Sequence, residues 1–107
     1  MICHLQLFTL KPEVTPDRLE EMMWLTRTSL LRIREVLHLN VGKRIKPEDP
    51  WHWFVSMEVE SLDKLAILQD DPHYFKFQQE VLKPSVDMEK AQILTFEMEP
   101  RKDVKYS

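Results

Sequence analysis

The 107-residue sequence has one cysteine, one glycine and no long apolar run, and each scarcity excludes a class of protein. The single cysteine, Cys3, cannot form an intramolecular disulfide, which argues against a disulfide-held secreted domain. The single glycine, Gly42, leaves no room for a glycine-rich phosphate-binding loop or for the Gly-x-Ser-x-Gly turn of hydrolases. No apolar stretch approaches the roughly 18 residues that a transmembrane helix needs.

An excess of basic residues is also missing, because 15 lysines and arginines face 18 aspartates and glutamates, for a formal net charge of -3. Nucleic-acid partners select for a basic face, so none is expected. The N-terminal residues lead directly into a strand-like segment that contains Gln6, without the features of a signal peptide. We therefore expect a cytoplasmic protein without a membrane-spanning segment. Its length predicts one domain, over residues 1–100, followed by a polar tail at 101–107.

The clearest structural signal is the alternation in residues 51–60, WHWFVSMEVE. One of the two alternating sets is wholly apolar, and the other is mixed. A period of two predicts a strand whose apolar side faces a helix layer. The same period predicts three more strands, at residues 2–10, 37–41 and 91–98.

Helices are predicted between these strands. Thr15, Pro16 and Asp17 form a helix start with a hydroxyl cap, a first-turn proline and an acid near the positive end of the dipole. Helical spacing then predicts a helix to about Glu35, with a core side formed by Leu19, Met22, Met23, Thr26, Leu30 and Ile33. Two large residues on this helix, Trp24 and Leu31, lie partly off the core side and suggest a second contact surface.

Two shorter helices are expected in the second half of the chain. Ser61 caps the first of them, which should turn Leu62, Leu65, Ala66 and Leu68 inward. The second covers about residues 73–82, should bury Tyr74, Phe77 and Val81, and ends or bends at Pro84.

The order strand, helix, strand, strand, helix pair, strand predicts an α+β, ferredoxin-like βαββαβ fold, with a four-stranded antiparallel sheet and helices on one face. The other face of that sheet would be largely apolar, since it would carry Phe54, Leu94, Phe96 and Met98, with Leu5 or Phe8. A second copy of the same sheet is the simplest cover for such a face, so the sequence predicts a homodimer.

Four segments resemble one known family. They are ICHLQLFTLKPEVTPDRLEE at 2–21, VGKRI at 41–45, EVESLDKL at 58–65 and, above all, DDPHYFKFQQEVLKP at 70–84. In order and spacing they resemble the stress-responsive α/β-barrel family, the dimeric α+β barrels often called Dabb proteins, over roughly residues 2–100. The resemblance implies a homodimer in which two sheets pack into a barrel.

The family includes uncharacterised proteins, heat- and salt-induced plant proteins and cofactor-free polyketide cyclases. In the cyclases, a pocket between sheet and helices holds a catalytic histidine and a catalytic tyrosine, supported by a histidine on the first strand. By resemblance, His4 matches the first-strand histidine. The catalytic histidine position falls on Tyr74, the catalytic tyrosine position on Leu68 and a further pocket histidine on Trp53, while Asp71 replaces the histidine of a His-Pro pair. The chain thus keeps one polar pocket residue and lacks the acid/base pair.

Candidate catalytic residues are His4, as a general base or ligand-orienting group, and Tyr74, as a proton donor. The alternative is that both pack in the core with their polar atoms satisfied. An apolar pocket with two polar guides is also expected, and its candidate ligand-binding residues are Gln6, Phe8, Met22, Met23, Trp53, Val55, Met57, Ile93 and Thr95. These residues equally fit a completely filled core.

No metal site and no cofactor are expected, because His4, His38, His52 and His73 show no ligand spacing. The two carboxylates Glu58 and Glu60 share a side of their strand and are expected to be solvated there.

Three hypotheses on function follow. The first is a homodimeric stress-responsive barrel with a structural or stress-related role that binds a small apolar or aromatic ligand between sheet and helices. The alternative is a cofactor-free enzyme, similar to polyketide cyclases, lyases or monooxygenases, with His4 as base. The third is an interaction module that uses Trp24 and Leu31. The sequence leaves open whether the protein is an enzyme.

Overall fold

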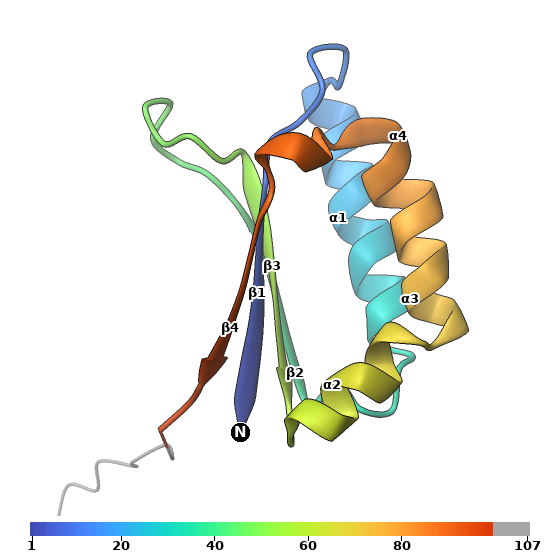
Figure 1. Cartoon of the computed structure of the whole chain (residues 1–107). Helices are drawn as coiled ribbons and strands as arrows, with labels where there is room; N and C mark the ends of the chain where they lie inside the picture. Colours follow the sequence, from blue (N-terminus) through green and yellow to red (C-terminus); the bar gives the residue numbers. More distant parts are fainter. Residues whose placement is uncertain (100–107) are drawn as a thin grey trace, which may run out of the picture.

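A four-stranded antiparallel sheet with helices on one face forms the structure, a computed structural model that describes residues 1–99 (Figure 1). The strands are β1 (Ile2–Phe8), β2 (His38–Lys43), β3 (Trp53–Val59) and β4 (Gln92–Glu97). They lie in the order β2-β3-β1-β4, so β1 and β3 are the inner strands. The predicted ferredoxin-like fold is confirmed, whereas the predicted tail at 101–107 lies outside the described residues.

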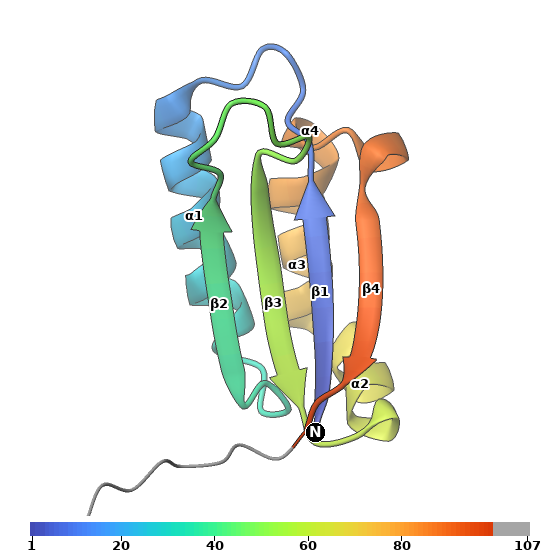
Figure 2. The same ribbon diagram turned by 90° about the vertical axis from the view of Figure 1, so that its left-hand side faces the viewer.

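The helical segments form a single layer. They are α1 (Pro16–Leu30), α2 (Leu62–Gln69), α3 (Pro72–Phe77), the π-helix η1 (Gln78–Leu82), α4 (Lys83–Ser85) and the short 3-10 turn η2 (Met88–Lys90). In the view turned by 90°, the sheet lies in front of the helices and none of the helical segments crosses it (Figure 2). The sheet therefore has a helix-facing side and an open outer side.

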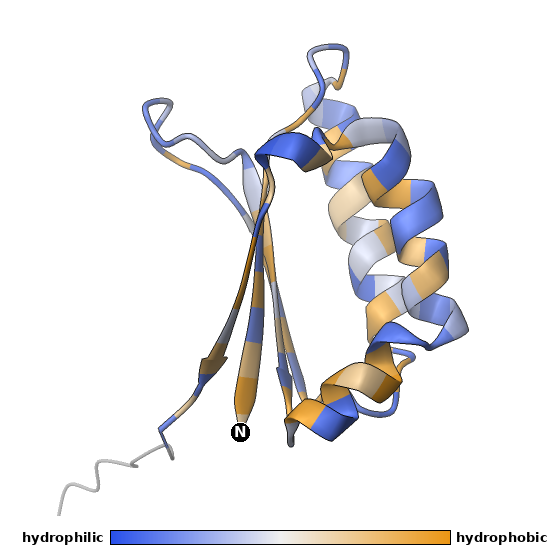
Figure 3. Ribbon diagram, viewed as in Figure 1, coloured by the Kyte–Doolittle hydropathy of each residue, from blue (hydrophilic) through white to orange (hydrophobic). Residues whose placement is uncertain are grey.

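The register of the strands fixes which side chains face the helices. In the pairing of β1 with β3, Gln6 lies opposite Val55 and Phe8 lies opposite Trp53. These residues point toward the helices and are buried, which confirms the period-two prediction for both inner strands. Hydrophobic and hydrophilic segments alternate along β1, as its colouring shows (Figure 3).

The outer side of the sheet is rich in apolar groups. Its members come from three strands and the residue after β4, and they are Leu5, Leu7, Phe54, Leu94, Phe96 and Met98. Phe96 is 49% exposed. The sequence had left Leu5 and Phe8 as alternatives for this face. Leu5 takes the place, because Phe8 is fully buried on the helix-facing side.

The helix starts predicted from the capping residues Thr15 and Ser61 are confirmed. The Thr15 hydroxyl accepts a hydrogen bond from the Arg18 N–H, and Ser61 does the same for Lys64. Residue Asp71 caps α3 by accepting from the His73 N–H. Each cap satisfies one of the donors that a helix start leaves free.

Two predictions about the helices were wrong. The first helix ends at Leu30 rather than near Glu35, because successive tight turns follow it, with Ile33 N–H bonded to the Leu30 carbonyl. Ile33 is nevertheless buried, so its apolar spacing continued past the helix. In α2, Leu62 and Ala66 are exposed, and only Leu65 and Leu68 reach the core.

A π-helical turn interrupts the last helical run. Pro84 has no N–H to donate to the carbonyl of Glu80, four residues earlier, and its ring would clash there. The chain widens to the π-helix η1, in which the Lys83 N–H bonds to the Gln78 carbonyl. The Arg18 guanidinium donates to the freed Glu80 carbonyl over 3.0 Å. Turns of this type occur frequently at functional sites.

Candidate functional site

Four polar side chains form a hydrogen-bonded chain across the helix-facing side of the sheet. His4 Nδ1 lies 3.0 Å from the Thr95 hydroxyl, and His4 Nε2 lies 3.4 Å from Gln6 Nε2. Gln6 Nε2 also donates to the Tyr74 hydroxyl over 2.8 Å. The chain, here called the polar chain, thus connects the edge strand β4 through β1 to helix α3. It brings together both predicted catalytic residues and both predicted polar guides.

Register and helix geometry create this arrangement. His4 lies opposite Thr95 in the pairing of β1 with β4, so their side chains share one side of the sheet. Gln6 lies two residues further along the same side of β1. Tyr74 belongs to the first turn of α3, which Asp71 and Pro72 start, and its ring packs against Phe77 with centroids 5.8 Å apart.

Burial keeps the polar chain neutral. It lowers the pKa of His4, which is 3% exposed, below its ordinary value. Burial raises the pKa of Tyr74, partly offset by its hydrogen bond from Gln6. With Gln6 as donor to its Nε2, neutral His4 carries its proton on Nδ1 and donates to Thr95. The Tyr74 hydroxyl proton is then available to a further acceptor.

Two buried polar atoms on this side of the sheet have no hydrogen-bond partner among residues 1–99. They are Gln6 Oε1, an acceptor, and Trp53 Nε1, a donor. An unsatisfied buried polar group costs about 1–3 kcal/mol, and native proteins contain few of them. The site therefore offers one acceptor and one donor to a molecule that reaches it.

The predicted apolar lining residues divide into two groups. Phe8, Met22, Trp53, Val55 and Met57 are fully buried in one core cluster, and Met23 joins them at its border. Ile93, by contrast, is 46% exposed, and Thr95 is exposed as well. Since β4 is an edge strand, the helix layer leaves Ile93 and Thr95 uncovered, whereas His4 and Gln6 beside them are buried.

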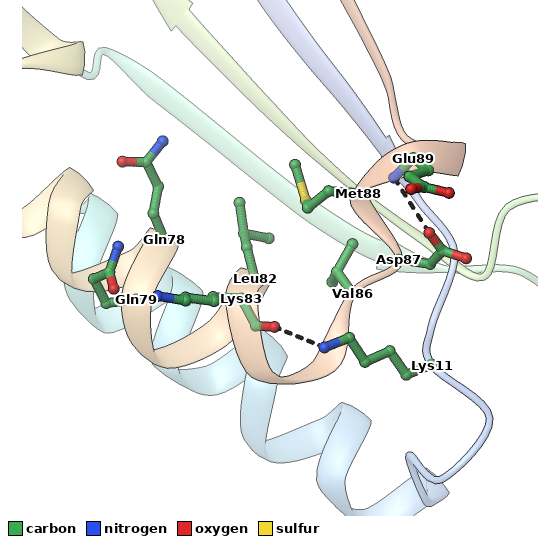
Figure 4. Close-up of a pocket in the computed structure, with 9 residues that line it drawn as sticks. All are labelled: Lys11, Gln78, Gln79, Leu82, Lys83, Val86, Asp87, Met88 and Glu89. Carbon is green, nitrogen blue, oxygen red and sulfur yellow. Dashed lines mark hydrogen bonds between the residues drawn. The ribbon is translucent and has the colours of Figure 1, made fainter.

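An open groove of about 610 Å³ lies between η1 and α4 on one side and the short turn η2 on the other (Figure 4). Gln78, Leu82 and Met88 extend into it, and Lys11 bounds it by donating to the Lys83 carbonyl over 3.0 Å. Leu82 belongs to the same core cluster as Tyr74. The π-helix η1 supplies three of the lining residues, so the widened turn shapes this groove.

The groove residues were not predicted from the sequence. Gln78, Leu82 and Met88 were not candidates, because helical spacing marks a core side and does not show where a helix widens. The available signal was Pro84 inside an otherwise helical pattern, which predicts that one carbonyl a turn earlier loses its partner.

Other candidate chemistry is less well supported by geometry. Among residues 1–99, no three histidine, cysteine, aspartate or glutamate side chains gather as a metal site would need. Cys3 faces the outer side of the sheet, with its Sγ 3.3 Å from the Ser56 hydroxyl.

The prediction that Glu58 is solvated was wrong, since it is only 6% exposed on the inner strand β3. Of the helices in the described part of the chain, none has the length and apolarity to cross a membrane.

Comparisons with known proteins agree with this fold. The family model described as Stress responsive A/B Barrel Domain matches residues 2–100. No match was found among curated proteins. A solved Dabb family protein of Mesorhizobium loti with a ferredoxin-like fold is 23% identical, with a TM-score of 0.78, and the match covers 92% of this chain and 97% of that one.

Two further solved structures are similar. A dimeric ferredoxin-like protein of unknown function from Thermobifida fusca is 19% identical, with a TM-score of 0.80 and coverage of 91% of this chain and 90% of that chain. A hydroxynitrile lyase from Passiflora edulis is 12% identical, with a TM-score of 0.78 and coverage of 95% and 96%. At these identities the likeness shows the fold alone, and solved neighbours of this fold include dimers.

Proposed function

Because the chain belongs to the stress-responsive A/B barrel domain family, we propose that it forms a homodimer and binds a small apolar or aromatic molecule between its sheet and its helices. The observation that carries the ligand proposal is the buried, unpartnered Gln6 Oε1 within the polar chain. A buried acceptor without a donor has an uncompensated desolvation cost. It therefore favours a ligand that donates a hydrogen bond to it.

The chemistry of the site narrows the ligand class. The polar chain contains neutral groups only, so it offers no charge to hold a carboxylate or an ammonium group. Its surroundings are apolar, which is the usual composition of a small-molecule site with a few orienting polar groups. A neutral molecule with an apolar body and a hydroxyl, such as an alkylphenol, would donate to Gln6 Oε1 and pack its apolar body against the surrounding core residues.

Calorimetric titration with 4-propylphenol and with propylbenzene tests this proposal. We expect the phenol to bind about five-fold more tightly, because its hydroxyl satisfies the buried acceptor at about 1 kcal/mol net. Gln6→Leu should remove this preference, whereas Gln69→Leu, a matched change at an exposed amide on α2, should keep it. Equal binding of both compounds to the unaltered protein would contradict the proposal.

The homodimer proposal is supported by the outer side of the sheet and by the dimeric neighbours. Leu94, Phe96 and Met98 leave a contiguous apolar face, and monomers rarely keep such faces exposed. A two-fold axis would place this face against its own copy. Native mass spectrometry measures the subunit count and any retained molecule together; a monomer at micromolar concentration would contradict the dimer.

A second candidate function is cofactor-free acid–base catalysis with His4 as base. One observation favours it: neutral His4 and the protonated Tyr74 hydroxyl contact the same Gln6 Nε2, so a substrate that displaces the 3.4 Å contact between Gln6 and His4 meets the His4 Nε2 lone pair as a base, with the Tyr74 hydroxyl as a nearby acid. A hydroxynitrile lyase from Passiflora edulis has a similar fold.

Hydrogen–deuterium exchange at the carbon beside the carbonyl of phenylacetone tests the base. We expect exchange above the buffer rate with the unaltered protein and its loss in His4→Asn, which keeps a polar side chain. The matched change His38→Asn, on the exposed edge strand β2, should leave the rate unaltered. Exchange that survives His4→Asn would remove the proposed base.

A further inference from the structure

A smaller pocket of about 270 Å³ lies between α1 and α3, and the polar chain does not contribute to it. Its walls include Trp24, Ser29 and Arg32 from α1 and the turn after it, with His73 and Lys76 from α3. This site, here called the α1–α3 pocket, is smaller than the roughly 300–1,000 Å³ of pockets that hold drug-sized molecules. It fits one ring or short chain with a single polar head.

The charges of the α1–α3 pocket are all basic. Arg32 and Lys76 are exposed, and neither has a carboxylate within ion-pair distance among residues 1–99. The third basic side chain, His73, uses its Nδ1 on Asp71 at 2.9 Å, which leaves Nε2 for another partner. Among residues 1–99, no acidic side chain lines the pocket, although the whole chain has a net charge of -3. The local charge therefore favours an anion.

The apolar wall of the α1–α3 pocket is formed by an exposed tryptophan. Trp24 is 56% exposed on α1, and Leu31 lies two turns further along at 62% exposed. An indole beside two cations can pack against an apolar group while its N–H donates to an acceptor. Tryptophan and arginine are also the residues that most often dominate binding energy at protein surfaces.

We propose that the α1–α3 pocket binds a carboxylate that carries an apolar or aromatic group. Arg32 and Lys76 hold the carboxylate by charge-assisted hydrogen bonds, and Trp24 packs against the apolar group. Such a group has two sources, a free carboxylic acid or an acidic segment of another protein. This site is independent of the ligand proposed for the polar chain, because the two share no residue.

Titration of ¹⁵N-labelled protein with phenylacetate, followed by nuclear magnetic resonance, tests the site. We expect saturable shifts of the Trp24 indole N–H at millimolar concentrations. The isosteric controls 2-phenylethanol and 2-phenylethylammonium should bind at least about three-fold more weakly, since they lack the anion. Equal shifts with all three compounds, or shifts confined to other residues, would overturn the proposal.

Charge variants make the assignment specific. Arg32→Gln and Lys76→Gln should each weaken phenylacetate binding about three-fold, and together about ten-fold, which is the range for solvent-exposed ion pairs. Arg34→Gln, a matched change at an exposed arginine that does not line the pocket, should leave binding unaltered. If Arg34→Gln weakens binding as much as Lys76→Gln does, the effect is general attraction and the site is refuted.

The source of the carboxylate is decided by a second ligand. An acetylated and amidated hexapeptide with one phenylalanine among glutamates presents the same chemistry on a protein segment. Tighter binding of the peptide than of phenylacetate, lost in Lys76→Gln, identifies a protein segment as the source. Tighter binding of phenylacetate identifies a free acid. The absence of binding by either compound overturns the proposal.

Discussion

Gln6 on β1 donates a hydrogen bond to the Tyr74 hydroxyl on α3 over 2.8 Å, although the two residues are 68 positions apart in the chain. Both side chains are buried, and the same Gln6 nitrogen lies 3.4 Å from His4. This contact joins the sheet to the helix layer by a side-chain hydrogen bond inside the core. It also determines which atoms of the site remain free for a ligand.

A double-mutant cycle measures this contact. Tyr74→Phe removes only the hydroxyl, and we expect a loss of about 1 kcal/mol in the free energy of unfolding, the usual net value of one buried hydrogen bond. Gln6→Met should cost a similar amount, because it leaves His4 and Tyr74 without their shared donor. The double variant should cost less than the sum, with a coupling energy of about 0.5–1.5 kcal/mol in urea unfolding. Additive costs would mean that the two side chains do not interact.

Stability should fall as the pH drops below about 6.5, the ordinary pKa of a histidine in an unfolded chain. Burial lowers the pKa of His4 in the folded state. The pKa of His52 is lowered mainly by burial and to a smaller extent by the positive charges of Arg44 and Lys90. A group whose folded pKa is depressed binds its proton more readily when unfolded. Its contribution is therefore complete above about pH 6.5 and is lost as the pH falls toward the folded pKa.

Urea unfolding across this pH range checks that expectation. For buried His4, the slope can reach about 1.4 kcal/mol per pH unit. Neutral His52 also makes a specific hydrogen bond, because its Nδ1 accepts from the Leu10 N–H over 2.8 Å. Protonation of His52 removes that acceptor. His4→Gln should flatten the pH dependence, whereas His38→Gln, at an exposed position, is the control. A slope that His4→Gln leaves unchanged would show that another group causes it.

Much of the fold was predictable from the sequence because its signals are local. The period of two in residues 51–60 identified the side chains that face the helices, and the period of two in residues 2–10 identified a strand without assigning its sides. Cap chemistry at Thr15 and Ser61 identified two helix starts. The end of α1 was not predictable in the same way. Ile33 continues the apolar spacing of the helix although it lies in a turn. Only the tertiary structure shows that this buried residue lies outside the helix.

The candidate site shows the same limit. The sequence placed His4 and Tyr74 in one pocket through a family resemblance, but not the link through Gln6. That link depends on strand register and on the position of α3, which no local pattern contains. The exposure of Ile93 could not be predicted either. Alternation assigns a side chain to one side of the sheet and does not show how far the helices extend over that side.

Changing Phe96 to lysine should dissociate the proposed dimer. Phe96 lies on the outer side of the sheet, and a two-fold axis would bury two copies of the new ammonium group in one apolar interface. We expect the dissociation constant to rise roughly 100-fold or more, because an uncompensated buried charge costs about 3 kcal/mol or more. Sedimentation velocity measures this. Ile67→Lys, at a half-exposed apolar position on α2, should leave the dimer intact. Loss of the dimer in both variants would instead indicate general destabilisation.

Gly42 should be required because of its cross-strand neighbour and not because of its backbone. A Cβ added at Gly42 would lie 2.5 Å from Cε1 of the Phe54 ring, yet no described residue has a positive φ, so alanine fits the backbone. Gly42→Ala therefore has to displace the ring on the outer side of the sheet, and we expect the dimer to weaken about three- to ten-fold. In a Phe54→Leu background the obstacle is gone, and Gly42→Ala should stabilise the fold by up to about 1 kcal/mol, since alanine restricts the unfolded chain more than glycine does. A loss of stability in both backgrounds, measured by urea unfolding, would place the constraint in the β2 backbone and not in the aromatic ring.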